Sequence, residues 1–157
     1  MDIKNLQIEK SANAPRRDPI NPSHRILVVD DNTSARQLNV DLLRDHGYGA
    51  EGVKDGVAGW EAIQTSDYNL IITDNTMPRM TGVEMIGKLR AARMTVPIIM
   101  ATGALPTQEF TRKPWLKPDA SLQKPFTDDD LLTVVRSFLG PDDGRDDRKK
   151  SLIPKYL

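Results

Sequence analysis

Three short apolar segments of the chain each end at polar side chains, and this pattern limits the fold more than any other feature. Residues 26–29 lead into Asp30-Asp31, residues 70–72 into Thr73-Asp74, and residues 97–101 into Thr102. Short apolar runs bounded by polar residues are typical of buried parallel strands. Parallel strands end at a common edge of their sheet, where ligands of open α/β proteins bind. We therefore expect an α/β fold in which these polar side chains converge.

Helical periodicity between the apolar runs indicates a regular alternation of strands and helices. The strands are expected over 25–30, 48–53, 68–73, 95–101 and 120–123, and the helices over 35–46, 55–64, 81–93 and 127–139. Residues 103–119 interrupt the series, because Pro106, Pro114 and Pro118 prevent a long fourth helix. A short helical segment over 107–112 remains compatible with those prolines.

Two apolar groups are expected to face the interior in addition to the strands. Leu38, Leu42 and Leu43 form an apolar stripe on the first helix. Phe110, Trp115 and Leu116 are expected to pack back onto the sheet from the proline-rich segment.

Length and composition predict one domain with no disulfides. The chain has 157 residues, no cysteine, and 22 basic against 22 acidic residues, so its net charge favours neither a nucleic-acid nor a membrane partner. No signal peptide or membrane span is expected, and a cytoplasmic location follows as the default. We expect a flexible N-terminal arm over 1–23, a folded domain over 24–140, and a flexible C-terminal tail over 141–157 that is too short for a DNA-binding module.

The converging side chains predict magnesium-dependent chemistry at phosphorus. Crowded carboxylates such as Asp30, Asp31 and Asp74 repel one another unless a hard cation such as Mg²⁺ holds them together. Magnesium also leaves coordination positions for phosphate oxygens. Asp74 ends a central strand alone and is the candidate nucleophile, while Lys124 and Thr102 offer a charge and a hydroxyl for the phosphoryl oxygens.

The same residues resemble the receiver domain of two-component response regulators. The resemblance covers residues 24 to 140 and rests on VVDDN at 28–32, TDNTMPRMTG at 73–82, IIMATG at 98–103 and KPF at 124–126. It implies a doubly wound, flavodoxin-like sheet of five parallel strands in the order 2-1-3-4-5. Because the tail after residue 140 is too short for a second domain, we further expect a response regulator of the stand-alone type.

The resemblance assigns further roles in the site. A sensor histidine kinase or histidine phosphotransfer protein would donate the phosphoryl group to Asp74, and Mg²⁺ would be bound by Asp31, Asp74 and the Thr76 carbonyl. Asp30 would act through water, and the backbone at Thr76 and Gly103 would contact the phosphate. The peptide bond before Pro125 would be cis. The chain would be no enzyme beyond its own phosphorylation and dephosphorylation, and its output would be a contact with a downstream protein or a phosphorelay.

Two departures from the receiver pattern keep an alternative open. Ser121 stands where many receivers carry Tyr or Phe, and Lys117-Pro118 replaces the usual Gly-Ala before the last strand. These changes predict an altered signalling surface around an intact phosphorylation centre. The alternative is a receiver-like interaction module that works without phosphorylation. A magnesium-dependent phosphatase acting on small substrates is a third reading, but the chain shows no substrate-binding insertion.

Overall fold

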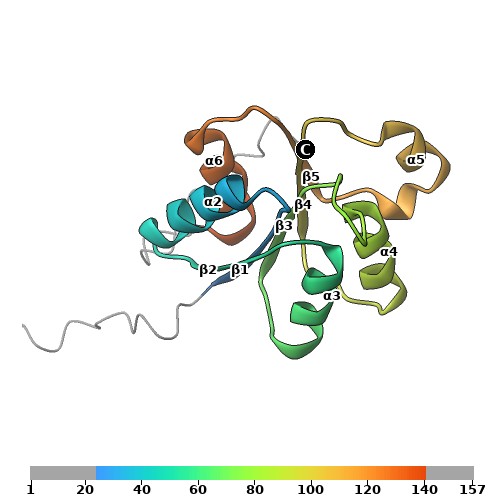
Figure 1. The fold of residues 1–157 in the computed structure, drawn as a ribbon, viewed down its shortest axis with the longest axis horizontal. Coiled ribbons are helices and arrows are strands. Elements are labelled where there is room, and N and C mark those ends of the chain that lie inside the picture. The colour runs from blue at the N-terminus through green and yellow to red at the C-terminus, as the bar shows by residue number, and fades with distance from the viewer. Residues whose placement is uncertain (1–23, 141–157) are drawn as a thin grey trace, which may run out of the picture.

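A computed structural model of the chain describes residues 24–140, which form a parallel sheet of five strands between two layers of helices (Figure 1). The strand order is β2-β1-β3-β4-β5, as the resemblance predicts. The elements are β1 (Arg25–Val29), α2 (Thr33–Asp45), β2 (Gly49–Val53), α3 (Gly56–Thr65), β3 (Leu70–Thr73), α4 (Gly82–Ala91), β4 (Ile98–Thr102), α5 (Thr107–Arg112), the 3₁₀ helix η1 (Pro114–Leu116), β5 (Ala120–Gln123) and α6 (Asp128–Leu139). The arms expected at 1–23 and 141–157 lie outside the described residues.

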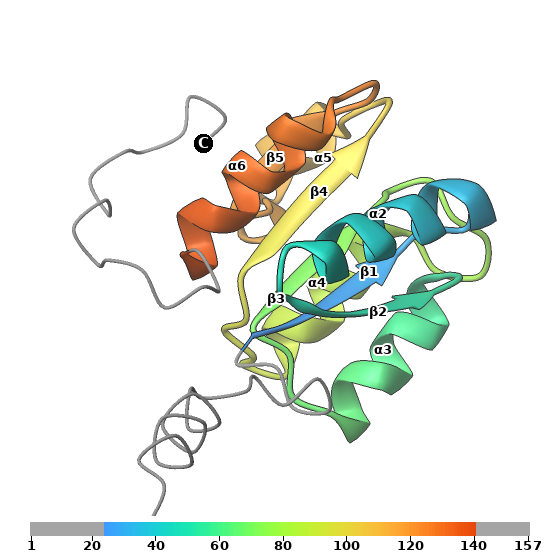
Figure 2. The same ribbon diagram turned by 90° about the vertical axis from the view of Figure 1, so that its left-hand side faces the viewer.

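Strand side chains alternate between two apolar cores, one on each face of the sheet. Ile26 and Val28 of β1 join the core under α2 and α6, while Leu27 and Val29 join the core under α3, α4 and η1. Figures 1 and 2 show this division of the helices between the two faces. Because both faces are covered, the central strand β3 is buried along its whole length.

Local side chains set the helix boundaries close to the positions expected from the sequence. The Asn32 side chain accepts a hydrogen bond of 2.9 Å from the Ala35 backbone and caps α2. At α6, Thr127 and Asp130 form a reciprocal capping box. Strand β4 starts at Ile98 rather than at residue 95.

Two apolar residues that we expected to face the interior lie at the surface. Leu38 is 70% exposed, because the buried side of α2 is formed by Val40 and Leu43. Two residues advance a helix by about 200°, so Leu38 points away from the side that Val40 occupies. Trp115 is 63% exposed, since only the next residue of η1, Leu116, reaches the core. Phe110 is partly buried against that core, as expected.

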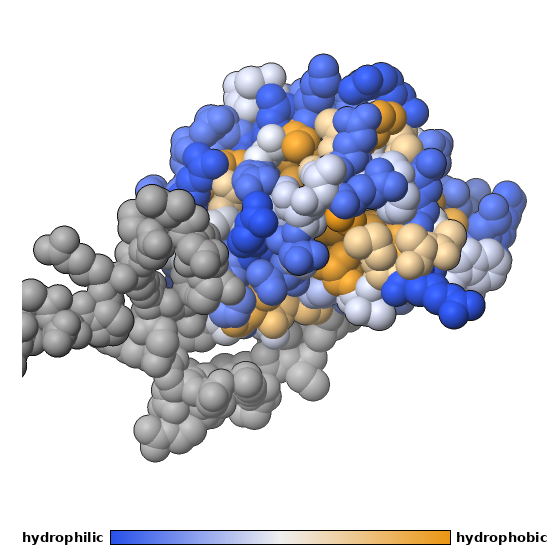
Figure 3. Space-filling view, turned by 90° about the horizontal axis from the view of Figure 1, so that it is seen from below, coloured by the Kyte–Doolittle hydropathy of each residue, from blue (hydrophilic) through white to orange (hydrophobic). Residues whose placement is uncertain are grey.

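Hydrophobic residues also come to the surface elsewhere, among hydrophilic ones, on the face seen in Figure 3. Within residues 24–140, no helix has the length and apolar character needed to cross a membrane.

Candidate functional site

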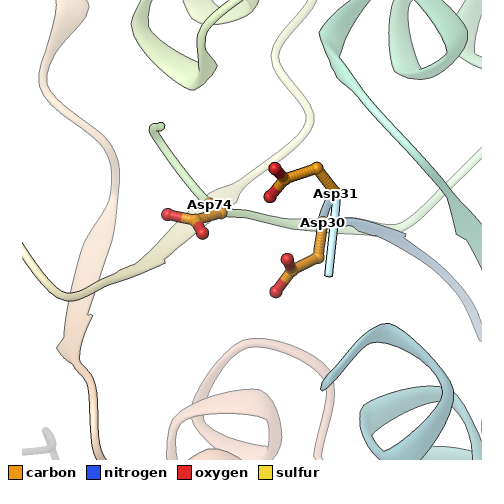
Figure 4. A group of neighbouring side chains, drawn as sticks. All are labelled: Asp30, Asp31 and Asp74. Carbon is orange, nitrogen blue, oxygen red and sulfur yellow. The ribbon is translucent and has the colours of Figure 1, made fainter. Parts of the chain in front are cut away.

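Three aspartates meet where two neighbouring strands end. Asp30 and Asp31 follow β1 directly, and Asp74 follows β3. These strands pair in parallel with Val29 opposite Thr73, so the register brings the next residues together. One carboxylate oxygen from each aspartate lies within 4.8 Å of the others (Figure 4). The expected convergence of acidic side chains is therefore present.

The two consecutive aspartates have different surroundings. Asp30 is 4% exposed, and its Oδ1 accepts a hydrogen bond of 2.9 Å from the Asn32 backbone. Its carbonyl oxygen accepts a hydrogen bond of 2.8 Å from Arg36, which fixes the backbone at the end of β1. Asp31 is exposed. Asp30 is thus held by the protein, whereas Asp31 is open to a ligand from solvent.

Lys124 neutralises part of this negative charge from the other side of the site. Its Nζ lies 3.0 Å from Oδ2 of Asp30 and 3.2 Å from Oδ2 of Asp74. Partial burial lowers the pKa of Lys124, but the hydrogen bond to Asp30 and the charges of both aspartates outweigh burial and raise the pKa above its usual range. The lysine therefore remains charged at neutral pH.

A backbone hydrogen bond joins Lys124, at the end of the last strand, to Thr102 at the end of β4. The Lys124 backbone donates a hydrogen bond of 2.9 Å to the Thr102 carbonyl oxygen. The Lys124-Pro125 peptide bond is cis, as the resemblance predicts. The lysine and Thr102 consequently lie on adjacent strand ends, β5 and β4.

The loop between β3 and α4, residues 74–81, is held by hydrogen bonds from Asn75 to Asp74 and from the start of α4 to Asn75. The Asn75 backbone donates to Oδ1 of Asp74 over 2.6 Å. Oδ1 of the Asn75 side chain accepts a hydrogen bond of 3.1 Å from the Val83 backbone nitrogen. The backbone carbonyl oxygen of Asn75 accepts one of 3.0 Å from the Gly82 backbone nitrogen. A Cβ on Gly82 would lie 2.3 Å from the Asp74 carbonyl oxygen, so only glycine fits this approach. No pattern in the sequence points to Asn75, because its contribution depends on the folded loop.

The remaining candidates are divided between loops, which hold Thr76 and Gly103, and strands, which hold Thr102 and Ser121. Thr76 is exposed, two residues after Asp74. Thr102 ends β4 and is 1% exposed, with its hydroxyl 3.5 Å from the Ala104 backbone nitrogen. Gly103 is exposed, and a Cβ there would meet nothing within 4 Å. There is consequently open space beside the threonine. Ser121, in β5, is half-buried opposite Met100.

The donor set fits a small, hard divalent cation. Three carboxylates supply oxygen ligands, and two of the residues at the site, Asp31 and Thr76, are exposed to solvent. The three carboxylates carry three negative charges and Lys124 carries one positive charge, so two negative charges remain for a divalent cation to neutralise. Such a site can bind a cation and phosphate oxygens together.

A family model described as the response regulator receiver domain matches residues 26–136. Among curated proteins, the transcriptional regulatory protein DltR of Streptococcus agalactiae is 34% identical over 112 residues, which are 71% of this chain and 50% of that protein. The response regulator MprA of Mycobacterium sp. is 33% identical over 125 residues, or 78% of this chain and 54% of that protein. The chain thus spans about half the length of these relatives.

Solved structures with the same fold support this match. The chemotaxis protein CheY4 of Vibrio cholerae has a TM-score of 0.67 and 30% identity, covering 73% of this chain and 98% of that one. The response regulator protein TrrA of Thermotoga maritima, solved in complex with Mg²⁺ and BeF, has a TM-score of 0.64 and 28% identity, covering 73% and 98% of the two chains.

Proposed function

This chain belongs to the response regulator receiver domain family, and from that premise we propose that it is a signalling switch that accepts a phosphoryl group on Asp74. Receiver domains take phosphoryl groups from histidine kinases, so a sensor histidine kinase or a histidine phosphotransfer protein is the donor in this proposal. The observation that carries it is the meeting of Asp30, Asp31, Asp74 and Lys124 at one end of the sheet.

The proposed transfer is a displacement at phosphorus. An Asp74 carboxylate oxygen forms a bond to the phosphorus, the bond from phosphorus to the donor's imidazole nitrogen breaks, and the nitrogen keeps the electron pair and takes up a proton. Lys124 Nζ, now 3.2 Å from Asp74, is placed to pair with a phosphoryl oxygen. The buried hydroxyl of Thr102 is a second donor, and the open space beside Gly103 admits the group.

Receiver domains bind Mg²⁺ at an acidic pocket, and we assign this role to Asp31, Asp74 and the Thr76 carbonyl, with Asp30 acting through water. When bound, the ion supplies positive charge for the phosphoryl oxygens. Asp30 is suited to an indirect role, because it is already engaged by Lys124 and by the Asn32 backbone. The same residues would catalyse dephosphorylation of the chain itself, with no other substrate.

The proposed output is a regulated contact with another protein, from a cytoplasmic location. Phosphorylation would shift Thr102 toward the phosphoryl group and thereby bias the segment that follows it, which leads into α5 and η1. Passage of the phosphoryl group through a phosphorelay is the other form of output. The absence of a nucleic-acid partner remains a prediction from charge balance, and the curated relatives include transcriptional regulatory proteins twice as long as the matched region.

A second candidate is an interaction module that works without phosphorylation. Two observations favour keeping it: Ser121 occupies the position at which many receivers carry an aromatic partner for the switch threonine, and Trp115 is 63% exposed on the neighbouring surface. An exposed tryptophan is a common anchor in protein interfaces.

Intact-protein mass spectrometry after incubation with Mg²⁺ and acetyl phosphate tests the proposal. We expect one phosphoryl adduct on the wild type, and none on Asp74→Asn or in the presence of EDTA. Asp41→Asn is the matched control, since Asp41 is an exposed aspartate of α2 that accepts a hydrogen bond from Gln37, and its adduct should form normally. No adduct on the wild type, together with no beryllofluoride binding, would favour the interaction module.

A further inference from the structure

A buried carboxylate outside the acidic cluster holds the loop that follows Asp74. Asp55 lies between β2 and α3 and is 2% exposed. Its Oδ1 accepts a hydrogen bond of 2.9 Å from the Ala58 backbone and caps α3. Its Oδ2 accepts two bonds from Arg79, 2.8 Å from Nε and 2.5 Å from Nη2. A single aspartate therefore begins a helix and binds a loop residue that lies 24 positions away.

Arg79 has a backbone conformation that a residue other than glycine rarely adopts. Its φ is 66°, in the left-handed region where the Cβ atom is crowded. Among residues 24–140, only Arg93 shares this feature outside glycine, with a φ of 58°. Arg93 is exposed, lies beyond the opposite end of α4, and makes no ion pair with any residue described by the structure. The two arginines thus share a backbone conformation but differ in their side-chain contacts.

The loop also touches α3 at the next residue. A Cβ on Gly56 would lie 2.5 Å from the Met80 carbonyl oxygen, so the first residue of α3 approaches the loop closely. The Met77 and Met80 side chains are buried in the core beneath. The loop is therefore attached to α3 through Arg79 and Met80, and to α4 through Asn75. Thr76 lies between these two attachments.

We propose that Asp55 and Arg79 are positioning residues, whose ion pair holds the 74–81 loop in the conformation that presents the Thr76 carbonyl to Mg²⁺. This inference rests on the proposed function, because it concerns the ligand that completes the proposed metal site. Mg²⁺ requires nearly octahedral geometry, so a ligand on a loose loop binds it more weakly than a ligand on a fixed one. Residues that orient metal ligands typically change metal affinity by about 10-fold or more when they are replaced.

Three variants distinguish the effect of losing the ion pair from the effect of changing the residue at a positive φ. Arg79→Gly removes the guanidinium, while glycine accepts the same φ without crowding. In Asp55→Asn, the side-chain oxygen of the asparagine still accepts the hydrogen bond from the Ala58 backbone. The NH₂ group of the asparagine then faces Arg79, and because it is a donor without charge, the ion pair is lost. Arg79→Lys should restore much of the function, because both bonds of Arg79 end on the same oxygen and one ammonium group can reach it. Arg93→Gly is the matched control.

Calorimetric titration with Mg²⁺ alone is the first measurement. We expect Arg79→Gly and Asp55→Asn to lower the affinity about 10-fold, the double variant to be no worse than either single variant, and Arg93→Gly to bind as the wild type does. Hydrogen exchange of the metal-free proteins should show faster exchange at the backbone amides of positions 76, 77, 79 and 80 in Arg79→Gly and Asp55→Asn only. With saturating Mg²⁺, their rate of modification by acetyl phosphate should return toward that of the wild type.

Wild-type Mg²⁺ affinity and wild-type loop exchange in both Arg79→Gly and Asp55→Asn would overturn the inference. Equal losses in Arg79→Gly and Arg93→Gly would also overturn it, because they would reflect the backbone change rather than the pair. The proposed function fails separately: if wild-type protein binds Mg²⁺ but forms no adduct on Asp74, phosphorylation is refuted while the positioning role stands.

Discussion

In the absence of metal, Asp31→Asn should be more stable than the wild type. Once Mg²⁺ is present, the variant should be less stable than the wild type. The Asp31 carboxylate shares the cluster with Asp30 and Asp74, and one oxygen of each lies within 4.8 Å of the others. Lys124 pairs with the other two aspartates but not with Asp31 in the described part of the structure. Asp31 therefore contributes repulsion without a compensating cation until a metal binds.

The distance fixes the size of this effect. At 4.8 Å two unit charges repel by about 0.9 kcal/mol in water, and by about 3.5 kcal/mol at an effective dielectric constant of 20. Asp31 is exposed, so the lower value is the better guide, and salt reduces it further. Two such repulsions give about 1–2 kcal/mol in the free energy of unfolding. For a domain of this size that is a rise of about 4–8 °C in the unfolding midpoint.

Mg²⁺ should reverse the order of stability. A ligand at 100 times its dissociation constant stabilises the folded state by about 2.7 kcal/mol, and Asp31→Asn loses most of this gain because it lacks one proposed ligand. Urea unfolding monitored by tryptophan fluorescence, with EDTA and then with Mg²⁺, measures both states. Asp41→Asn, an exposed change on α2, should be neutral in both. A variant less stable than the wild type in EDTA would refute the account of repulsion, and equal stabilisation of both proteins by Mg²⁺ would refute the ligand role.

Three more predictions follow from single contacts. Lys124→Met should lower the free energy of unfolding in EDTA by about 1–2 kcal/mol in urea titrations, because it leaves two carboxylates without their cation at a partly exposed site. Gly82→Ala should cost about 1–3 kcal/mol in the same titration and slow adduct formation, whereas Gly87→Ala, whose Cβ would meet its nearest neighbour at 3.4 Å, should be tolerated. Burial and a hydrogen bond to Glu51 raise the pKa of Tyr68 to about 12. The stability from Tyr68 is therefore present below about pH 10 and is lost as pH rises toward 12, and Tyr68→Phe should remove this loss in alkaline unfolding curves.

The sequence predicted the position of the acidic residues because parallel strands share an edge. Asp30 and Asp74 follow apolar runs, and the two aspartates lie near each other when those runs pair in parallel with their ends aligned, as Val29 and Thr73 are. The strand order could not be predicted from periodicity and was predicted only from the resemblance to receivers. The short α5 was also predictable, because the prolines around it exclude a longer helix.

Burial was harder to predict for residues whose exposure depends on the direction in which the side chain points rather than on its hydrophobicity. Leu38 belongs to an apolar stripe on the sequence, yet Val40 and Leu43 set the buried side of α2 and leave Leu38 outside. Trp115 lies in a single 3₁₀ turn, where consecutive residues point in different directions and periodicity gives no signal.

Contacts between distant segments gave no local signal at all. Asp55 was visible only as the start of a helix, and nothing in the sequence pairs it with Arg79, because the contact depends on how the loop after Asp74 turns toward α3. Gly59 is a similar case. A glycine inside a helix usually weakens it, but a Cβ on Gly59 would lie 2.8 Å from the Met85 sulfur, so the glycine permits close packing of α3 on α4.

The site divides its parts between rigid strand ends and loops, and this division explains how one local event could reach the surface. Asp30, Asp74 and Lys124 are the residues that come directly after β1, β3 and β5. These strands belong to one sheet, in which the spacing between strands hardly varies. Thr76 and the residues after Thr102 lie on loops. If Asp74 is phosphorylated as proposed, we expect the loops rather than the strands to move. One of these loops is held by Asp55 through Arg79, and the other leads into α5 and η1. Because the first loop is held by an ion pair and the second leads through α5 to the exposed Trp115 of η1, the second is the better route for the proposed output.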